Sequence, residues 1–215
     1  MIVDERFSSY INSLNEGNRG VLYEIEREAL KTDVPIIRTE TQQFIRTILH
    51  EHKPVAILEV GTAIGFSAVY MACNNPVSCH ITTIENYEKR IPIAKENFKR
   101  ASVEDKITLI EGDATEVLKS LDGKFDLIFM DAAKAQYINF YPDVKRLLKP
   151  NGILLSDNVL QDGDIVESRF VVIRRNRTIH KRMREYLYTL THDDDMVTSI
   201  LPIGDGVAFT VKKEQ

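Results

Sequence analysis

Oxygen-bearing side chains follow two hydrophobic runs in the second half of the sequence. Asp131 comes directly after the run Phe125 to Met130, and Asp157 and Asn158 end the next such run. Continuous hydrophobic runs are typical of buried parallel strands, whose carboxyl ends form the ligand-binding edge of an open α/β sheet. Two carboxylates and an amide oxygen, with no thiol or imidazole nearby in the sequence, favour a hard cation such as Mg²⁺. With Lys134 three residues after Asp131, the pattern indicates metal-assisted chemistry at an oxygen atom.

A glycine turn in the segment 58–67 indicates a cofactor site. It separates a strand pattern from a helix start, and the helix N-terminus offers free N–H groups to a ligand. Gly61 and Gly65 have the spacing Gly-x-x-x-Gly, which differs from the dinucleotide fingerprint, and a turn without a ligand is the alternative. Glu85 lies at the end of the next expected strand, where an acid can accept hydrogen bonds from ribose hydroxyls. The segment 111–114 follows the third expected strand, where the adenine ring would lie. Three such features at successive strand ends predict a cofactor that carries a nucleoside.

Strand and helix patterns alternate after His52, which predicts a mostly parallel sheet covered by helices on both faces. The expected strands are 55–60, 80–84, 107–110, 125–130 and 152–156, and the helices between them are 67–73, 88–100, 114–120 and 136–148. Helices at 19–31 and 39–50 precede them, with an extended segment at 34–37. Strands at 197–202 and 207–212 flank the turn dipeptide Asp205-Gly206, so an antiparallel hairpin is expected to end the sheet.

In this order, the motifs 59–67, Glu85, 112–114, Asp131-x-x-Lys134 and Asp157-Asn158 resemble the catechol and caffeoyl-coenzyme-A O-methyltransferase family. The resemblance implies a Rossmann-like class I methyltransferase fold with a seven-stranded sheet, S-adenosylmethionine and Mg²⁺ or another divalent cation as cofactors, and a homodimer. It implies that the cofactor is bound by Ile37, Gly61, Ser67, Glu85, Asp113, Ala114 and Asp131, the metal by Asp131, Asp157 and Asn158, and that Lys134 is the general base. Ala132 and Ala133 depart from the bulkier pair in the animal catechol enzyme.

The expected mechanism follows from the cofactor, because its sulfonium methyl is already activated. A metal that chelates two adjacent substrate oxygens lowers the pKa of the reacting hydroxyl and directs it at the methyl group. A neighbouring cation and sulfonium would favour the neutral form of Lys134, which can then accept the hydroxyl proton.

The basic segment 169–184 is a clue to the molecule that accepts the methyl group. It contains seven Lys and Arg and no acid, although the whole chain has a net charge of −4. Such a segment favours a polyanionic partner, with a solvated helix face or an oligomer contact as the alternative. The chain also resembles bacterial tRNA 5-hydroxyuridine methyltransferases in this segment, expected to be one helix, and in 201–206. We therefore expect methylation of the wobble 5-hydroxyuridine of tRNA. A small-molecule catechol or caffeoyl acceptor is the alternative, and a non-catalytic nucleic-acid-binding module or a nicotinamide oxidoreductase is more distant.

Length and composition fit one soluble domain over 1–215, whose first 52 residues would cover the cofactor and substrate site. Hydrophobic residues make up 43% of the chain, yet no apolar run suggests a membrane span, and the N-terminus lacks the pattern of a signal peptide. Two cysteines are read as reduced, which predicts a cytoplasmic protein. Tyr137 and Tyr141 are expected to pack in the core, with a substrate contact as the alternative for Tyr137. The segment 193–195 is expected to form a solvated loop, and Asp205 to be either a turn acid or a pocket residue.

Overall fold

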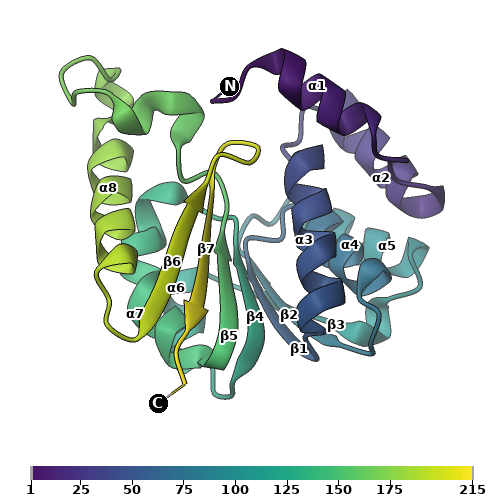
Figure 1. The fold of residues 1–215 in the computed structure, drawn as a ribbon. Helices are drawn as coiled ribbons and strands as arrows, with labels where there is room; N and C mark the ends of the chain where they lie inside the picture. Colours follow the sequence, from purple (N-terminus) through teal and green to yellow (C-terminus); the bar gives the residue numbers. More distant parts are fainter. Residues whose placement is uncertain (1, 215) are drawn as a thin grey trace.

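The computed structural model describes residues 2–214, and Figure 1 shows a twisted sheet between two layers of helices. The strand order is β3-β2-β1-β4-β5-β7-β6. Strands β1 to β5 are parallel, and β7 is antiparallel to both of its neighbours. This confirms the predicted seven-stranded, mostly parallel sheet with a closing hairpin. The strands are β1 (Ala56–Val60), β2 (His80–Glu85), β3 (Ile107–Glu111), β4 (Phe125–Met130), β5 (Leu148–Ser156), β6 (Met196–Leu201) and β7 (Val207–Lys212).

The site is positioned by the change of direction between β1 and β4. The chain builds β2 and β3 on one side of β1, then returns to place β4 on the other side. In register, Val60 of β1 lies opposite Met130 of β4, so the glycine turn and Asp131 start at the same level. Ligands bind at such a switch point in open α/β sheets.

Helices bury apolar stripes against both faces of the sheet. On one face, α2 (Gly20–Lys31), α3 (Thr39–His52), α4 (Phe66–Asn74) and α5 (Ile91–Arg100) share a core with β1 and β4. On the other, α6 (Ala114–Ser120), α7 (Tyr137–Leu147) and α8 (Arg177–Thr191) pack together. One helix begins later than the sequence predicts. Helix α5 starts at Ile91 rather than at residue 88, because Pro92 favours the first helical turn.

Three features differ from the sequence-based expectations. An additional helix, α1 (Glu5–Ser13), precedes α2 and has no buried residue. The basic segment is not one helix, because α8 begins only at Arg177 and the residues before it form turns and the short 3-10 helix η4 (Arg174–Asn176). The segment 193–195 is a loop with Asp194 exposed, as predicted, but Asp193 is not solvated as expected, because the Lys145 ammonium and the Tyr141 hydroxyl each donate to its carboxylate at 2.7 Å. Burial opposes ionisation there, but these hydrogen bonds keep the pKa of Asp193 below its ordinary value.

Part of the basic segment has a structural role. The guanidinium of Arg177 donates to the carbonyls of Val172 and Phe170, each at 3.1 Å. Arg182 and Arg184 likewise donate to backbone carbonyls that precede α8 in the chain. These three cations therefore hold the protein's own backbone. In the part of the chain that the structure describes, none of the helices combines the length and the apolar character needed to cross a membrane.

Candidate active site

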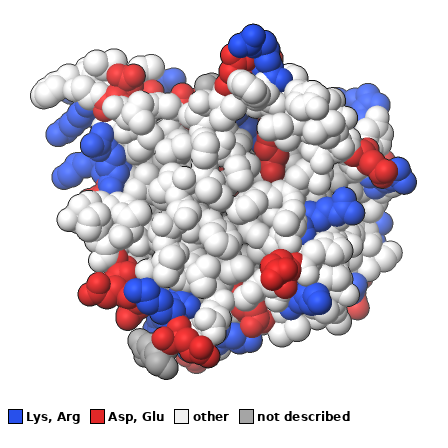
Figure 2. Space-filling model, in the orientation of Figure 1, with Lys and Arg blue, Asp and Glu red and all other residues white. Residues whose placement is uncertain are grey.

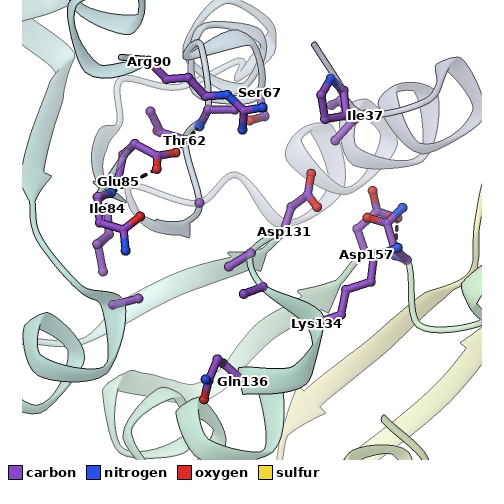
Figure 3. Close-up of a pocket in the computed structure, with 18 of the residues that line it drawn as sticks. Ile37, Thr62, Ser67, Ile84, Glu85, Arg90, Asp131, Lys134, Gln136 and Asp157 are labelled. Atoms are coloured by element: carbon purple, nitrogen blue, oxygen red, sulfur yellow. Dashed lines mark hydrogen bonds between the residues drawn. The ribbon is translucent and has the colours of Figure 1, made fainter. Parts of the chain in front are cut away.

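A pocket of about 680 Å³ opens at the carboxyl ends of β1, β2, β3, β4 and β5 (Figure 3). It contains every site residue expected from the sequence: Ile37, Gly61, Ser67, Glu85, Asp113, Ala114, Asp131, Lys134, Asp157 and Asn158 all line it. The structure therefore brings the predicted set together, while the role of each residue stays a prediction. The volume of the pocket is within the range of small-molecule and cofactor sites.

Gly61 allows the ends of β1 and β4 to approach closely. Its φ is +98°, and a Cβ there would lie 2.9 Å from the carbonyl carbon of Asp131 and closer still to the oxygen. Next to this contact, the Asp131 N–H donates to the Val60 carbonyl at 3.0 Å. A side chain at position 61 would therefore separate the two strands that carry the site.

Glu59 supports the glycine turn from inside the sheet, and its role was not predicted. Its carboxylate is fully buried and accepts hydrogen bonds from the hydroxyls of Ser67, Thr62 and Thr83. Burial raises the pKa of Glu59. Ser67, expected to contact the methionine part of the cofactor, thus lines the pocket with its hydroxyl turned to Glu59. An acid inside an otherwise apolar strand is the signal that could have revealed this support.

The carboxylate of Glu85 is fixed at the end of β2. Its oxygens accept the N–H groups of Ala63 at 2.7 Å, Asn86 at 3.0 Å and Tyr87 at 2.9 Å. The first of these bonds ties Glu85 to the glycine turn, which orients it into the pocket (Figure 3). This arrangement suits the predicted ribose contact, since each carboxylate oxygen has more than one acceptor position.

Asp113 and Ile37 lie at the edges of the pocket. The Asp113 side chain caps α6 by accepting the Thr115 N–H at 2.8 Å, and hydrogen bonding to Thr115 lowers the pKa of Asp113. Ile37 is only 3% exposed, and its carbonyl accepts a hydrogen bond from the Gln42 side chain at 3.0 Å. The extended segment before α3 is thereby held against the pocket, as expected of a cofactor cover.

Asp157 is buried and Asp131 is half-buried, and both direct their carboxylates into the same part of the pocket (Figure 3). Burial raises the pKa of Asp131 to about 6, with Lys134 opposing the shift. Burial and the charge of Asp131 raise the pKa of Asp157 to about 7. Two neighbouring carboxyl groups repel each other electrostatically when both are ionised. A cation bound between them offsets this repulsion and stabilises the ionised pair.

The donor set fits a hard metal ion. Residues 2–214 contain no cluster of three or more His, Cys, Asp or Glu side chains that could hold a metal. Two carboxylates and the Asn158 amide would leave other positions to water or substrate, as Mg²⁺ prefers. Asn158 has a φ of +59°, a conformation that asparagine tolerates, and its N–H donates to Asp157 at 2.8 Å.

Lys134 begins the short 3-10 helix η2 (Lys134–Gln136), and its ammonium nitrogen lies 3.5 Å from the Asp205 carboxylate. Asp205 is buried, so the structure places it in the pocket rather than on an exposed turn. Tyr137 is fully buried, and its hydroxyl lies 3.1 Å from the carbonyls of both Met130 and Asp157. Core packing, the role expected for Tyr137, is confirmed.

Arg38 and Arg90 also line the pocket and had no signal in the sequence. Arg38 pairs with Asp162 at 3.2 Å, which joins the segment after Ile37 to the loop after Asn158. The two residues are 124 positions apart in the chain, so only the folded structure could reveal the pair.

Comparison with known proteins identifies the family. The model of the O-methyltransferase family matches residues 12–213. The chain belongs to this O-methyltransferase family. It is 31% identical over 177 residues to caffeoyl-CoA O-methyltransferase 1 of Eucalyptus globulus, covering 78% of this chain and 70% of that one. It is 28% identical over 169 residues to the catechol O-methyltransferase of Niastella koreensis, covering 76% of each.

Solved structures agree with this O-methyltransferase assignment. The SAH-bound methyltransferase PaMTH1 of Podospora anserina matches with a TM-score of 0.87 and 29% identity, covering 98% of this chain and 95% of that one. SAH is what S-adenosylmethionine leaves after methyl transfer. The predicted fold and the prediction of an S-adenosylmethionine-dependent O-methyltransferase are thus confirmed at the level of the family. The predicted tRNA acceptor is not supported by these relatives, whose names favour the catechol and caffeoyl alternative.

Proposed function

We propose that this O-methyltransferase uses S-adenosylmethionine and a divalent cation to methylate a hydroxyl that has a second oxygen beside it. The observation that carries the proposal is the pair of carboxylates at the ends of adjacent strands, buried Asp157 and half-buried Asp131, with Lys134 nearby. The glycine turn and Glu85 provide a nucleoside-binding side to the same pocket.

In this mechanism, Asp131, Asp157 and Asn158 would hold the metal, and Lys134 would take the proton of the acceptor hydroxyl. The metal, when bound, supplies Lewis acidity that lowers the pKa of a hydroxyl next to it. The protein contributes orientation, because both reactants bind on a sheet edge made rigid by the β1–β4 contact. The burial of Asp157, which is 2% exposed, lowers the local polarity and strengthens the electrostatic effect of its carboxylate.

The acceptor class favoured by the comparisons is a small aromatic molecule with vicinal hydroxyls. Relatives named as catechol and caffeoyl-CoA O-methyltransferases cover about three quarters of the chain. A catechol offers two adjacent oxygens, which is the arrangement that the proposed metal requires.

The second candidate is the 5-hydroxyuridine of tRNA, whose 5-hydroxyl and 4-carbonyl oxygens offer the same chelation. Arg169, Arg174, Arg175 and Lys181 are exposed, and no acid pairs with them within residues 2–214. Figure 2 shows Lys and Arg side chains gathered at the left edge, beside α8. Such unpaired cations favour phosphate contacts, and an anticodon loop can present an unstacked base.

The test compares acceptors directly. Transfer of labelled methyl from S-adenosylmethionine is measured with Mg²⁺ or with a chelator, on catechol, caffeoyl-CoA and tRNA that carries 5-hydroxyuridine. Mg²⁺-dependent label in any of them supports the proposal, and transfer unaffected by the chelator contradicts it. The triple variant Arg169→Ala, Arg174→Ala, Arg175→Ala should lose only tRNA activity if tRNA is the acceptor.

A matched variant controls for net charge. Replacing the exposed cations Lys31, Lys99 and Lys119 by Ala removes the same charge outside the basic segment. Equal losses of tRNA activity in both triple variants would attribute the effect to net charge rather than to a docking site.

We also propose a homodimer formed through the face of β6 and β7 that α3 leaves uncovered. Val197 is 57% exposed, and Ser199 and Val211 lie beside it on this face, beyond Phe209, whose ring packs against Phe44 of α3. Figure 2 shows a broad area without charged side chains in front of these strands. Light scattering should give a dimer mass for the wild type and a monomer for Val197→Asp; a monomeric wild type would refute the proposal.

A further inference from the structure

Asp205 lies in a turn, yet it is only 3% exposed. Turn acids normally face solvent, and a buried carboxylate is costly unless it has partners. Here one oxygen accepts the backbone N–H of Asp162, and the other lies 3.5 Å from the ammonium nitrogen of Lys134. The carboxylate therefore joins a loop of the pocket to the side chain proposed as the base.

Backbone contacts fix the position of this carboxylate. The N–H groups of Val159 and Leu160 donate to the carbonyls of Gly206 and Asp205, each at 3.0 Å. Gly206 has a φ of +87°, and a Cβ there would lie 2.7 Å from the Cβ of Leu160. The turn between β6 and β7 is thus packed directly against the loop that follows Asn158.

Lys134 needs such a fixed partner. Its side chain is 33% exposed, whereas that of Asp205 is 4% exposed. A lysine has a flexible stem and three equivalent donors, so a single rigid acceptor decides where its nitrogen lies. Asp131 and Asp157 also act electrostatically with Lys134, but the proposed metal would occupy them. Asp205 is then the carboxylate that remains for Lys134.

We propose that Asp205 is a positioning residue for methyl transfer, which holds the Lys134 nitrogen at the acceptor side of the pocket. This inference rests on the proposed function, because it takes Lys134 as the base. Asp205 touches no reacting atom in this role; it acts through Lys134.

The test is a double-mutant cycle with Asp205→Asn and Lys134→Met. Asparagine keeps the shape and the acceptor for the Asp162 N–H but removes the charge opposite Lys134. We expect Asp205→Asn to lower kcat about 10- to 100-fold, the cost of a catalytic group displaced by about 1 Å. KM and the affinity for SAH should change less than about twofold, since binding does not use Lys134. In the Lys134→Met background, Asp205→Asn should have almost no further effect on kcat.

Asp193→Asn is the matched control, because it weakens another partly buried Lys–Asp pair, with Lys145 at 2.7 Å, that does not line the pocket. It should leave kcat unchanged. If Lys134→Met loses activity but Asp205→Asn lowers kcat equally with and without Lys134, the positioning role is refuted while the proposed function stands. If Lys134→Met keeps full activity, Lys134 is not the base, and both the proposed role of Lys134 and the positioning role of Asp205 are refuted, whereas the methyl transfer itself is not. Asp205→Ala also removes the acceptor for the Asp162 N–H. A lower urea unfolding midpoint for Asp205→Ala than for Asp205→Asn would measure the support that the side chain gives to the loop, apart from its charge.

Discussion

Replacing Gly61 by Ala tests the claim that the site depends on close approach of β1 and β4. The substitution places a methyl group at a φ of +98°, directly against the Asp131 carbonyl. Backbone strain of this kind costs about 1 to 3 kcal/mol. The methyl also meets backbone atoms, which cannot rotate away, so the strand ends must separate and weaken the 3.0 Å bond from Asp131 to Val60.

Gly123 separates these two effects. It has a φ of +109°, but a Cβ there would meet no atom within 4 Å. Gly123→Ala should therefore lose only the strain energy, whereas Gly61→Ala should lose about 2 kcal/mol more, as overpacked sites do. Unfolding in urea gives both free energies of unfolding, and calorimetric titration with SAH measures the cofactor site. We expect Gly61→Ala to weaken SAH binding at least about tenfold, since the displaced turn is a binding surface. Equal stability losses and unchanged SAH affinity in both variants would refute the reasoning.

Three further predictions follow from the carboxylates. In the folded state the pKa of Asp131 is about 6 and that of Asp157 about 7, both above the ordinary value of 3.8. The native state therefore binds more protons than the unfolded state over this range, and the free energy of unfolding should fall as pH rises from 4 to 7. The double variant Asp131→Asn, Asp157→Asn should flatten that profile in urea titrations, and a flat wild-type profile would contradict the assignment. Mg²⁺ should raise the melting temperature of the wild type more at pH 8 than at pH 5, because protons compete for the ligands, and should not affect the double variant. The Asp126 carboxylate accepts hydrogen bonds from the N–H groups of Val55 and Ala56 at 3.0 and 2.9 Å. Asp126→Ala should therefore lower the free energy of unfolding by about 2 to 3 kcal/mol without changing the affinity for SAH. The control Asp122→Ala removes an exposed acid and should change neither quantity.

The predicted site came together because of the geometry of parallel sheets. Residues after buried strands share one edge, so Glu85, Asp131 and Asp157 could be grouped without knowing any contact. Residues that act through partners far along the chain could not be assigned. Asp205 has the same turn sequence whether it is exposed or buried, and its burial depends on loop 159–163 packing against it. Arg177 adds a basic charge in the sequence, yet its guanidinium caps backbone carbonyls in the folded protein.

The sequence by itself determined the order of the strands along the chain and of the helices between them, the antiparallel hairpin and the edge at which ligand groups collect. These follow from local signals: hydrophobic runs, glycine turns, proline, and the residue after each strand. Tertiary structure decided the support of the site, in which Glu59 holds the glycine turn, Asp205 reaches Lys134, and Arg38 joins Asp162. The reason is physical. Hydrogen bonds between distant residues depend on which buried surfaces meet, and one sequence position carries no record of its partner.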